Sequence, residues 1–212
     1  MKWESVVSLV ADEAVFSSAL LLSGDVSVRQ LRQQLSRWVK SGRLIQLRRG
    51  IYALAPTWRR VRPHPFPVAN QIRQGSYVSL QSALAWHDVI PEHVPVTTSV
   101  GPGRPGTISN PLGTFQFHHL AGGLHYGYER VEVAPRQFAF LASPEKALLD
   151  LVHFTTGADS EDYLSELRLQ NPTAFNMSKL EQLAQRSGKP KLVRAARLVG
   201  PLLAQEGEGD VL

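Results

Sequence analysis

The chain has no cysteine among its 212 residues. It therefore has no disulfide framework, no thiolate zinc site and no cysteine nucleophile, which excludes disulfide-stapled small folds and cysteine-dependent enzymes. The absence of cysteine is also typical of a protein that works in a reducing compartment.

Long apolar runs are absent as well. No stretch reaches the roughly 18 consecutive apolar residues that a transmembrane helix needs, and no cationic-then-apolar signal segment occurs. With 43% hydrophobic and 19% charged residues, the composition is that of a globular protein. We expect a cytoplasmic protein without membrane contact, long enough for two small domains.

Enzyme motifs are missing or incomplete. Residues 101–106 (GPGRPG) match G-x-G-x-x-G, but prolines fill two variable positions and no helical pattern follows, which favours a loop between two strands. Ser143 and Lys146 have S-x-x-K spacing without the S-D-N and K-T-G partners, so helix capping explains the serine better. We expect no catalytic residue and no cofactor.

A histidine cluster is the remaining candidate for a metal site. His118 and His119 are adjacent, and neighbouring residues of a strand point to opposite faces, so at most one of them can join His125 in a single site. Ordinary hydrogen bonds are the favoured interpretation, and we expect no metal.

The most informative segment is the basic stretch from Ser27 to Tyr52. Ser27 is a good helix N-cap, and Gln30 three residues later completes a capping box. Apolar residues then recur with helical spacing at positions 31, 35, 38 and 39, and Gly42 is typical of a helix end. At about 100° per residue, the opposite face carries polar and basic side chains: Arg29, Gln30, Gln33, Ser36, Arg37 and Lys40.

A small basic hairpin follows this helix. Two short β-prone runs, 44–47 and 51–54, flank Arg48-Arg49-Gly50. Upstream, a helix through residues 6–10 and a second at 19–22, followed by a turn at Gly24-Asp25, would supply the other two helices of a winged helix-turn-helix. In that fold, the third helix enters the major groove and the hairpin lies over the flanking phosphates.

The distribution of charge supports DNA binding. Residues 1–62 hold 11 Lys and Arg against 4 Asp and Glu, a net charge of +7, whereas residues 63–212 hold 12 against 14, a net charge of −2. The net charge of +5 therefore comes entirely from the first part of the chain. This is expected if one domain meets polyanionic phosphate and the other does not.

The remaining segments predict an α+β protein. A Pro/Arg-rich linker at residues 59–67 would separate a winged helix-turn-helix domain, residues 1–58, from a second α+β domain, residues 68–212, with a helical C-terminal end. In the second domain we expect strands near 94–100, 114–117 and 128–133, and a helix opened by Ser143 and Pro144. Further helices are predicted at 160–169, 178–186 and 191–203.

The chain resembles the AbiEi-like antitoxins of type IV toxin-antitoxin systems, known from abortive infection of bacteria by phage. The matching segments are the helix and wing ending at residues 48–53 (RRGIYA), then residues 77–84 (YVSLQSAL) with 89–91 (VIP), and residues 142–151 (ASPEKALLDL). The resemblance implies a promoter-binding autorepressor whose C-terminal domain neutralises a nucleotidyltransferase toxin. It implies inverted repeats of double-stranded promoter DNA as one partner, and antagonism of the toxin without a stable complex.

Within this hypothesis, Arg29, Gln30 and Gln33 approach base edges, because the N-terminal half of a recognition helix enters the groove most deeply. The other predicted DNA-binding residues grip or border phosphates: Ser27, Ser36, Arg37, Lys40, Arg48 and Arg49. Two alternatives stay open. One is a DNA-targeted metallonuclease, for which Glu145 and Asp150 are the best carboxylate pair, although they lie about 140° apart around a helix. The other is a one-component regulator that senses a small molecule.

Overall fold

The computed structural model describes residues 1–22 and 27–209, with side-chain surroundings described as far as residue 203. The N-terminal part begins with α1 (Trp3–Val10), β1 (Phe16–Ser17) and a 3-10 helix, η1 (Ser18–Leu21). The basic helix α2 (Val28–Lys40) and the hairpin of β2 (Leu44–Arg48) and β3 (Ile51–Leu54) follow. The predicted turn at Gly24-Asp25 lies outside the described residues.

These elements have the topology of a winged helix. The three strands form an antiparallel sheet in the order β1-β3-β2, and the β2–β3 hairpin is the wing. Gly50 closes the hairpin with φ +83, a conformation that residues with a Cβ rarely adopt. The helix predicted at 19–22 is the shorter 3-10 turn η1, whose N-cap Ser17 accepts a hydrogen bond from the amide of Ala19.

Helix α2 forms where the sequence predicts it. Leu31 and Leu35 are buried in the winged-helix core, with Trp38 and Val39 packed at its edge. Gly42, at φ +70, ends the helix as predicted, and the amide of Arg43 donates to the carbonyl of Trp38 at 2.9 Å. Ser27 is the N-cap residue, but its side chain makes no capping hydrogen bond, so the predicted capping box does not form. Its carbonyl instead accepts the first helical bond, from Leu31 at 2.9 Å.

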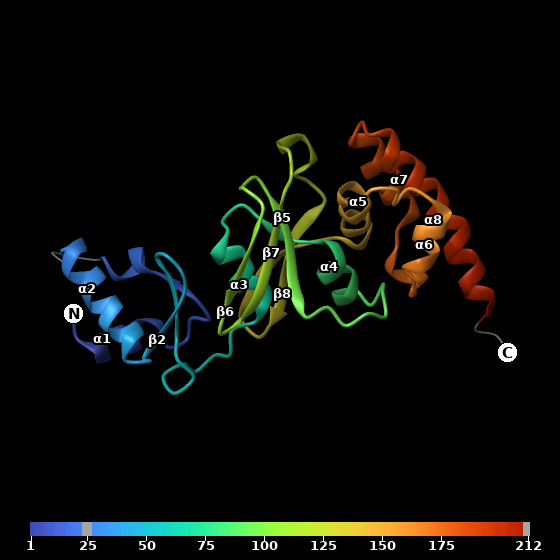
Figure 1. Ribbon diagram of the computed structural model, residues 1–212. Coiled ribbons are helices and arrows are strands. Elements are labelled where there is room, and N and C mark those ends of the chain that lie inside the picture. The colour runs from blue at the N-terminus through green and yellow to red at the C-terminus, as the bar shows by residue number, and fades with distance from the viewer. Residues whose placement is uncertain (23–26, 210–212) are drawn as a thin grey trace.

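A six-stranded mixed sheet forms the centre of the molecule (Figure 1), in the order β6-β7-β5-β4-β9-β8. Its strands are β4 (Tyr77–Val78), β5 (Val96–Gly101), β6 (Gly106–Asn110), β7 (Gly113–His119), β8 (Tyr128–Ala134) and β9 (Gln137–Ala142). Strand β4 pairs antiparallel with β5 and parallel with β9, and β5 runs parallel to β7. Residues 102–105 join β5 to β6, so the glycine-rich stretch is the predicted loop between strands.

Helices lie on both sides of this sheet (Figure 1). Helix α3 (Pro65–Ile72) is on the side that faces the winged helix, and α4 (Leu80–Trp86) and α5 (Pro144–Phe154) are on the other. Beyond α5 lie α6 (Glu161–Glu166), α7 (Met177–Arg186) and α8 (Pro190–Gly209), with the 3-10 turn η3 (Pro172–Ala174) between α6 and α7. Another 3-10 turn, η2 (Gly122–Leu124), lies between β7 and β8 in the sequence. The predicted α+β class and the helical C-terminal end are confirmed.

Strand β3 is buried on both faces. Tyr52 and Leu54 belong to the winged-helix core, whereas Ile51 and Ala53 belong to the core of the central domain. Because successive side chains of a strand point to opposite faces, one short strand serves two cores. The winged helix and the central domain are therefore in direct apolar contact, with Ile51 and Ala53 in the same cluster as Phe66 and Ile72 of α3.

The predicted linker differs in length and character from the structure. Residues 65–67 are not linker but the first turn of α3, which has Pro65 at its first position. Residues 62–64 are held against β9, because Gln137 accepts from the amide of His64 at 2.8 Å and donates to the carbonyl of Arg62 at 3.0 Å. The start of this short helix was not predicted, because its proline-rich sequence is typical of an extended linker.

Candidate nucleic-acid interface

Helix α2 presents a continuous polar surface. Its buried side chains lie along one stripe, and the six polar residues predicted from helical phase are exposed on the other side: Arg29, Gln30, Gln33, Ser36, Arg37 and Lys40. Ser27 before the helix and Arg48 and Arg49 in the wing are exposed as well. All nine predicted DNA-binding residues are thus accessible to solvent.

The structure adds two residues to this surface that helical phase alone did not select. Arg32, which the phase placed near the edge of the apolar stripe, is exposed. Val28, the first residue of α2, is 49% exposed, which is high for an apolar residue. The position of Val28 at the N-terminus of the helix could have been noticed in the sequence. An apolar side chain there can contact a thymine methyl group, which is one way in which proteins read DNA bases.

The two arginines of the wing have different surroundings. The guanidinium of Arg48 donates a hydrogen bond to the carbonyl oxygen of Ile72, the last residue of α3. Arg49, at the tip, is exposed. The wing is also attached through Gly50, whose carbonyl accepts from the amide of Ser18 at 2.8 Å. One guanidinium of the wing therefore helps to hold the domains together, although Arg48 still exposes part of its side chain.

The linker arginines are mostly solvated. Arg60 and Arg62 are exposed, and Arg60 pairs with Asp12 at 3.4 Å in an ion pair whose side chains are 73% and 50% exposed. Such an exposed pair adds little stability, about 0–1 kcal/mol.

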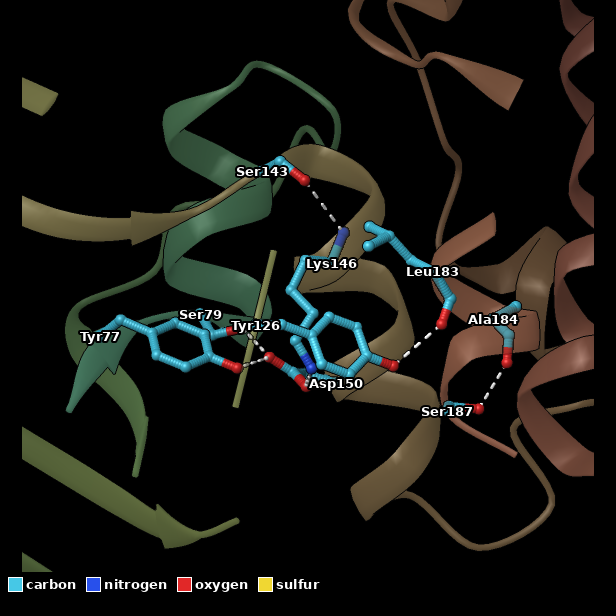
Figure 2. Close-up of polar contacts among 9 residues, drawn as sticks. All are labelled: Tyr77, Ser79, Tyr126, Ser143, Lys146, Asp150, Leu183, Ala184 and Ser187. Atoms are coloured by element: carbon cyan, nitrogen blue, oxygen red, sulfur yellow. Dashed lines mark hydrogen bonds and ion pairs between the residues drawn. The ribbon is translucent and has the colours of Figure 1, made fainter. Parts of the chain in front are cut away.

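A second polar cluster is buried in the central domain (Figure 2). Asp150 of α5 accepts three hydrogen bonds: from Lys146 at 2.6 Å, from Ser79 at 2.7 Å and from Tyr77 at 3.0 Å. The ammonium of Lys146 also lies 4.8 Å from the centre of the Tyr126 ring. The cluster joins β4 and the start of α4 to α5, so it lies where the central sheet meets its helical layer.

Burial determines the protonation behaviour of this cluster. Desolvation raises the pKa of Asp150, while the Lys146 ammonium and the hydroxyls of Ser79 and Tyr77 oppose the rise. Desolvation and the neighbouring Asp150 also raise the pKa of Tyr77 far above its usual range, so its hydroxyl stays protonated and donates. The three groups that contact the Asp150 carboxylate are all hydrogen-bond donors, so this buried carboxylate is satisfied, as is usual for buried polar groups with a structural role.

The carboxylates considered for a nuclease site are separated. Glu145 accepts from the amide of Asn176 at 2.9 Å and pairs with Lys179 of α7 at 3.1 Å, whereas Asp150 faces Tyr77 and Ser79. Across residues 1–22 and 27–203, no group of three or more His, Asp or Glu side chains is arranged to hold a metal ion. Ser143 caps α5 by accepting from the amide of Lys146 at 3.4 Å, so the S-x-x-K serine has the predicted structural role.

The histidines make ordinary contacts, as predicted. His119 lies 3.2 Å from the carbonyl oxygen of Gly103, and His125 lies 2.8 Å from that of Gly75. His118 packs against the ring of Phe154 at 5.0 Å, and burial lowers its pKa.

The comparison with protein families identifies the segment that contains this surface. Residues 26–55 match the family model described as "Transcriptional regulator, AbiEi antitoxin". Over these residues the chain is similar to that family. The match covers α2 and the whole wing, so the resemblance noted from the sequence is confirmed for this segment, and it supports a role as antitoxin and transcriptional regulator.

No curated protein matches the chain. In the described part of the chain, no helix has the length and apolar character that crossing a bilayer requires.

Proposed function

We propose that the chain is a DNA-binding repressor of its own promoter, with α2 in the major groove of an inverted repeat. Arg29, Gln30 and Gln33 contact base edges, since they lie on the N-terminal half of the exposed face. Ser36, Arg37 and Lys40 lie further along that face and contact phosphates, with Ser27 before the helix and Arg48 and Arg49 in the wing.

The observation that carries this proposal is the exposed basic face of α2 within the segment that matches the AbiEi regulators. An ordinary surface helix would also expose charges, but α2 has no acidic residue to balance its four cations, Arg29, Arg32, Arg37 and Lys40. An uncompensated cationic helix followed by a basic hairpin is what binding to a duplex requires.

Binding of the full chain to its promoter and to a random duplex, followed by fluorescence anisotropy, tests the proposal. We expect tighter binding to the promoter, and Arg29→Ala should reduce the discrimination by about 1–3 kcal/mol, roughly 5- to 150-fold. Arg104→Ala, at an exposed loop of the central domain, is the matched control and should bind like the unmodified chain. Equal losses on both duplexes for Arg29→Ala would remove Arg29 from the base-reading set.

We further propose that residues 68–212 neutralise a nucleotidyltransferase toxin without forming a stable complex. This proposal is supported by the antitoxin description of the matched family and by the absence of net positive charge in residues 63–212, which distinguishes them from the DNA-binding part. It predicts that the two roles can be separated by substitution.

The full chain is the proper material for this test. Deleting the winged helix would remove Ile51 and Ala53 from the core of the central domain and expose apolar surface there, so an isolated fragment is unsuitable. We expect Arg29→Ala/Arg37→Ala to lose promoter binding and still protect cells that express the neighbouring toxin. If the unmodified chain gives no protection, the antitoxin proposal fails, and the DNA-binding proposal is unaffected.

Two rival functions have direct tests. Magnesium-dependent cleavage of plasmid DNA by the purified chain would support the metallonuclease instead. A promoter-bound chain that a small molecule releases, with no nucleotidyltransferase gene beside it, would support the ligand-sensing regulator.

A further inference from the structure

Strand β8 is one edge of the central sheet, with β9 as its neighbour on one side. An edge strand carries backbone N–H and C=O groups that point away from the sheet and are available to another strand. The middle of β8 reads Arg130-Val131-Glu132, in which opposite charges flank a single apolar residue. Both charged side chains are exposed.

We propose that β8 pairs with β8 of a second copy of the chain, antiparallel and centred on Val131, to form a two-fold dimer with a continuous sheet. In this register, Arg130 of each copy lies opposite the partner's Glu132. Directly opposed residues of antiparallel strands have Cβ atoms about 4.5–5.5 Å apart, close enough for an ion pair. The same surface serves both copies, as an isologous interface requires.

The charges of β8 select this register over its neighbours. In two antiparallel strands related by a two-fold axis, directly opposed side chains must point to the same face of the sheet. The axis therefore passes between a residue and the same residue of the other copy, not between two successive residues. Centring on Arg130 would oppose two cations, and centring on Glu132 would oppose two carboxylates; each arrangement is unfavourable. Centring on Val131 avoids both and forms two ion pairs.

The local structure holds both charged groups ready for a partner. The guanidinium carbon of Arg130 lies 3.7 Å from the centre of the Phe138 ring of β9, a cation–π contact that limits its motion. Glu132 uses Oε1 to accept from the amide of Arg136 at 2.8 Å, which leaves Oε2 for the partner. Among the side chains of residues 1–22 and 27–203, neither has an ion-pair partner. The register shift in the β8–β9 ladder falls between Glu132 and Ala134, after the regular stretch that contains the three central residues.

The absence of cysteine allows a sharp test with the full chain. Val131→Cys places the thiols of the two copies next to each other across the two-fold axis. The opposed Cα atoms there are about 4.5–5.5 Å apart, within the range that a disulfide spans. We expect mild oxidation to give a covalent dimer without DNA. Ser109→Cys is the control, because Ser109 is exposed on β6, the opposite edge of the same sheet. It should give no covalent dimer under the same conditions.

Charge reversal tests the register. In the Val131→Cys background, Arg130→Glu or Glu132→Arg should each lower the cross-linked fraction by about tenfold, because like charges replace both ion pairs. The double reversal should restore cross-linking, which a merely misfolded variant would not do. Cross-linking no greater than that of Ser109→Cys, or no response to charge reversal, would overturn the proposal. The readout uses no DNA, so its failure is distinct from a failure of promoter binding.

Discussion

The ammonium of Lys146 lies 2.6 Å from Oδ1 of Asp150, and the two side chains are only 3% and 2% exposed. They are one turn apart on α5, and Asp150 reaches across to Tyr77 and Ser79 at the junction of β4 and α4. A buried ion pair that is fully hydrogen-bonded adds little net stability over an apolar pair, but removal of one partner leaves an uncompensated buried charge.

We therefore expect Lys146→Met and Asp150→Asn each to lower the free energy of unfolding by about 3–5 kcal/mol. The double variant should cost clearly less than the sum, because it removes both charges and Asn still accepts from the two hydroxyls. Urea unfolding followed by circular dichroism gives these values. Strictly additive losses would show that the two side chains are energetically independent.

Glu145 makes stability depend on acidic pH. Burial by itself raises the pKa of this carboxyl group, but hydrogen bonds from Ser143, the Asn176 amide and Lys179 outweigh it and bring the pKa below the ordinary value of 4.5. A carboxyl group with a lowered folded-state pKa contributes stability above about pH 4.5, and this is lost as the pH falls through the folded-state value.

The Glu145→Gln variant should lose this dependence. The stability difference between the unmodified chain and the variant should be constant from neutral pH to about pH 5, and should shrink below about pH 4.5. Burial lowers the pKa of His64, His118 and His153, which weakens both proteins as the pH falls below 6.5, so this effect cancels in the difference. A stability difference that stays constant down to pH 3 would rule out the assigned role of Glu145.

The wing arginines should differ in what they contribute. Arg49→Ala should weaken binding to promoter and random DNA alike, and flatten the slope of log affinity against log salt by about one, as for the loss of one phosphate contact. Its free energy of unfolding should change little, because Arg49 is exposed. Arg48→Ala should lower stability as well, since it loses the hydrogen bond to Ile72. An unchanged salt slope for Arg49→Ala would remove the tip of the wing from the interface.

The shared burial of β3 predicts a single unfolding transition. Trp3, Trp38 and Trp58 belong to the winged-helix part and only Trp86 to the central domain, so tryptophan fluorescence mainly reports the former and circular dichroism reports the whole chain. We expect the two signals to give the same midpoint, and Ala53→Asp, which buries a charge at the domain contact, to lower both equally. Separate midpoints would mean that the two domains unfold independently.

Local signals made the winged helix predictable. The apolar stripe of α2, the glycine after it and the Arg-Arg-Gly turn each depend on a few neighbouring residues, and each fixes a local backbone conformation. In the same way, Ser143 as N-cap and Pro144 at the first helical position indicated the start of α5. The six-stranded sheet was only partly predictable, because β4 is two residues long and gains its place through pairing with β5 and β9.

Contacts between distant segments escaped prediction. The uninterrupted apolar run of β3, residues 51–54, is consistent with burial on both faces, but nothing local identified the core of the central domain as its second neighbour. The spacing of Lys146 and Asp150 was equally visible, yet exposed and buried pairs share that spacing. The pair is placed inside the protein by residues distant in the sequence that contact it, Tyr77, Ser79 and Tyr126.

Because both faces of β3 are buried, the wing cannot move independently of the rest of the protein. In the proposed complex, the orientation of the β2–β3 hairpin relative to α2 is already fixed in the free protein. Little conformational freedom is therefore lost when DNA binds. Adjustment of groove width then falls to the nucleic acid, and sequences that already hold the required shape, or deform to it at small cost, are selected even at base pairs that no side chain touches.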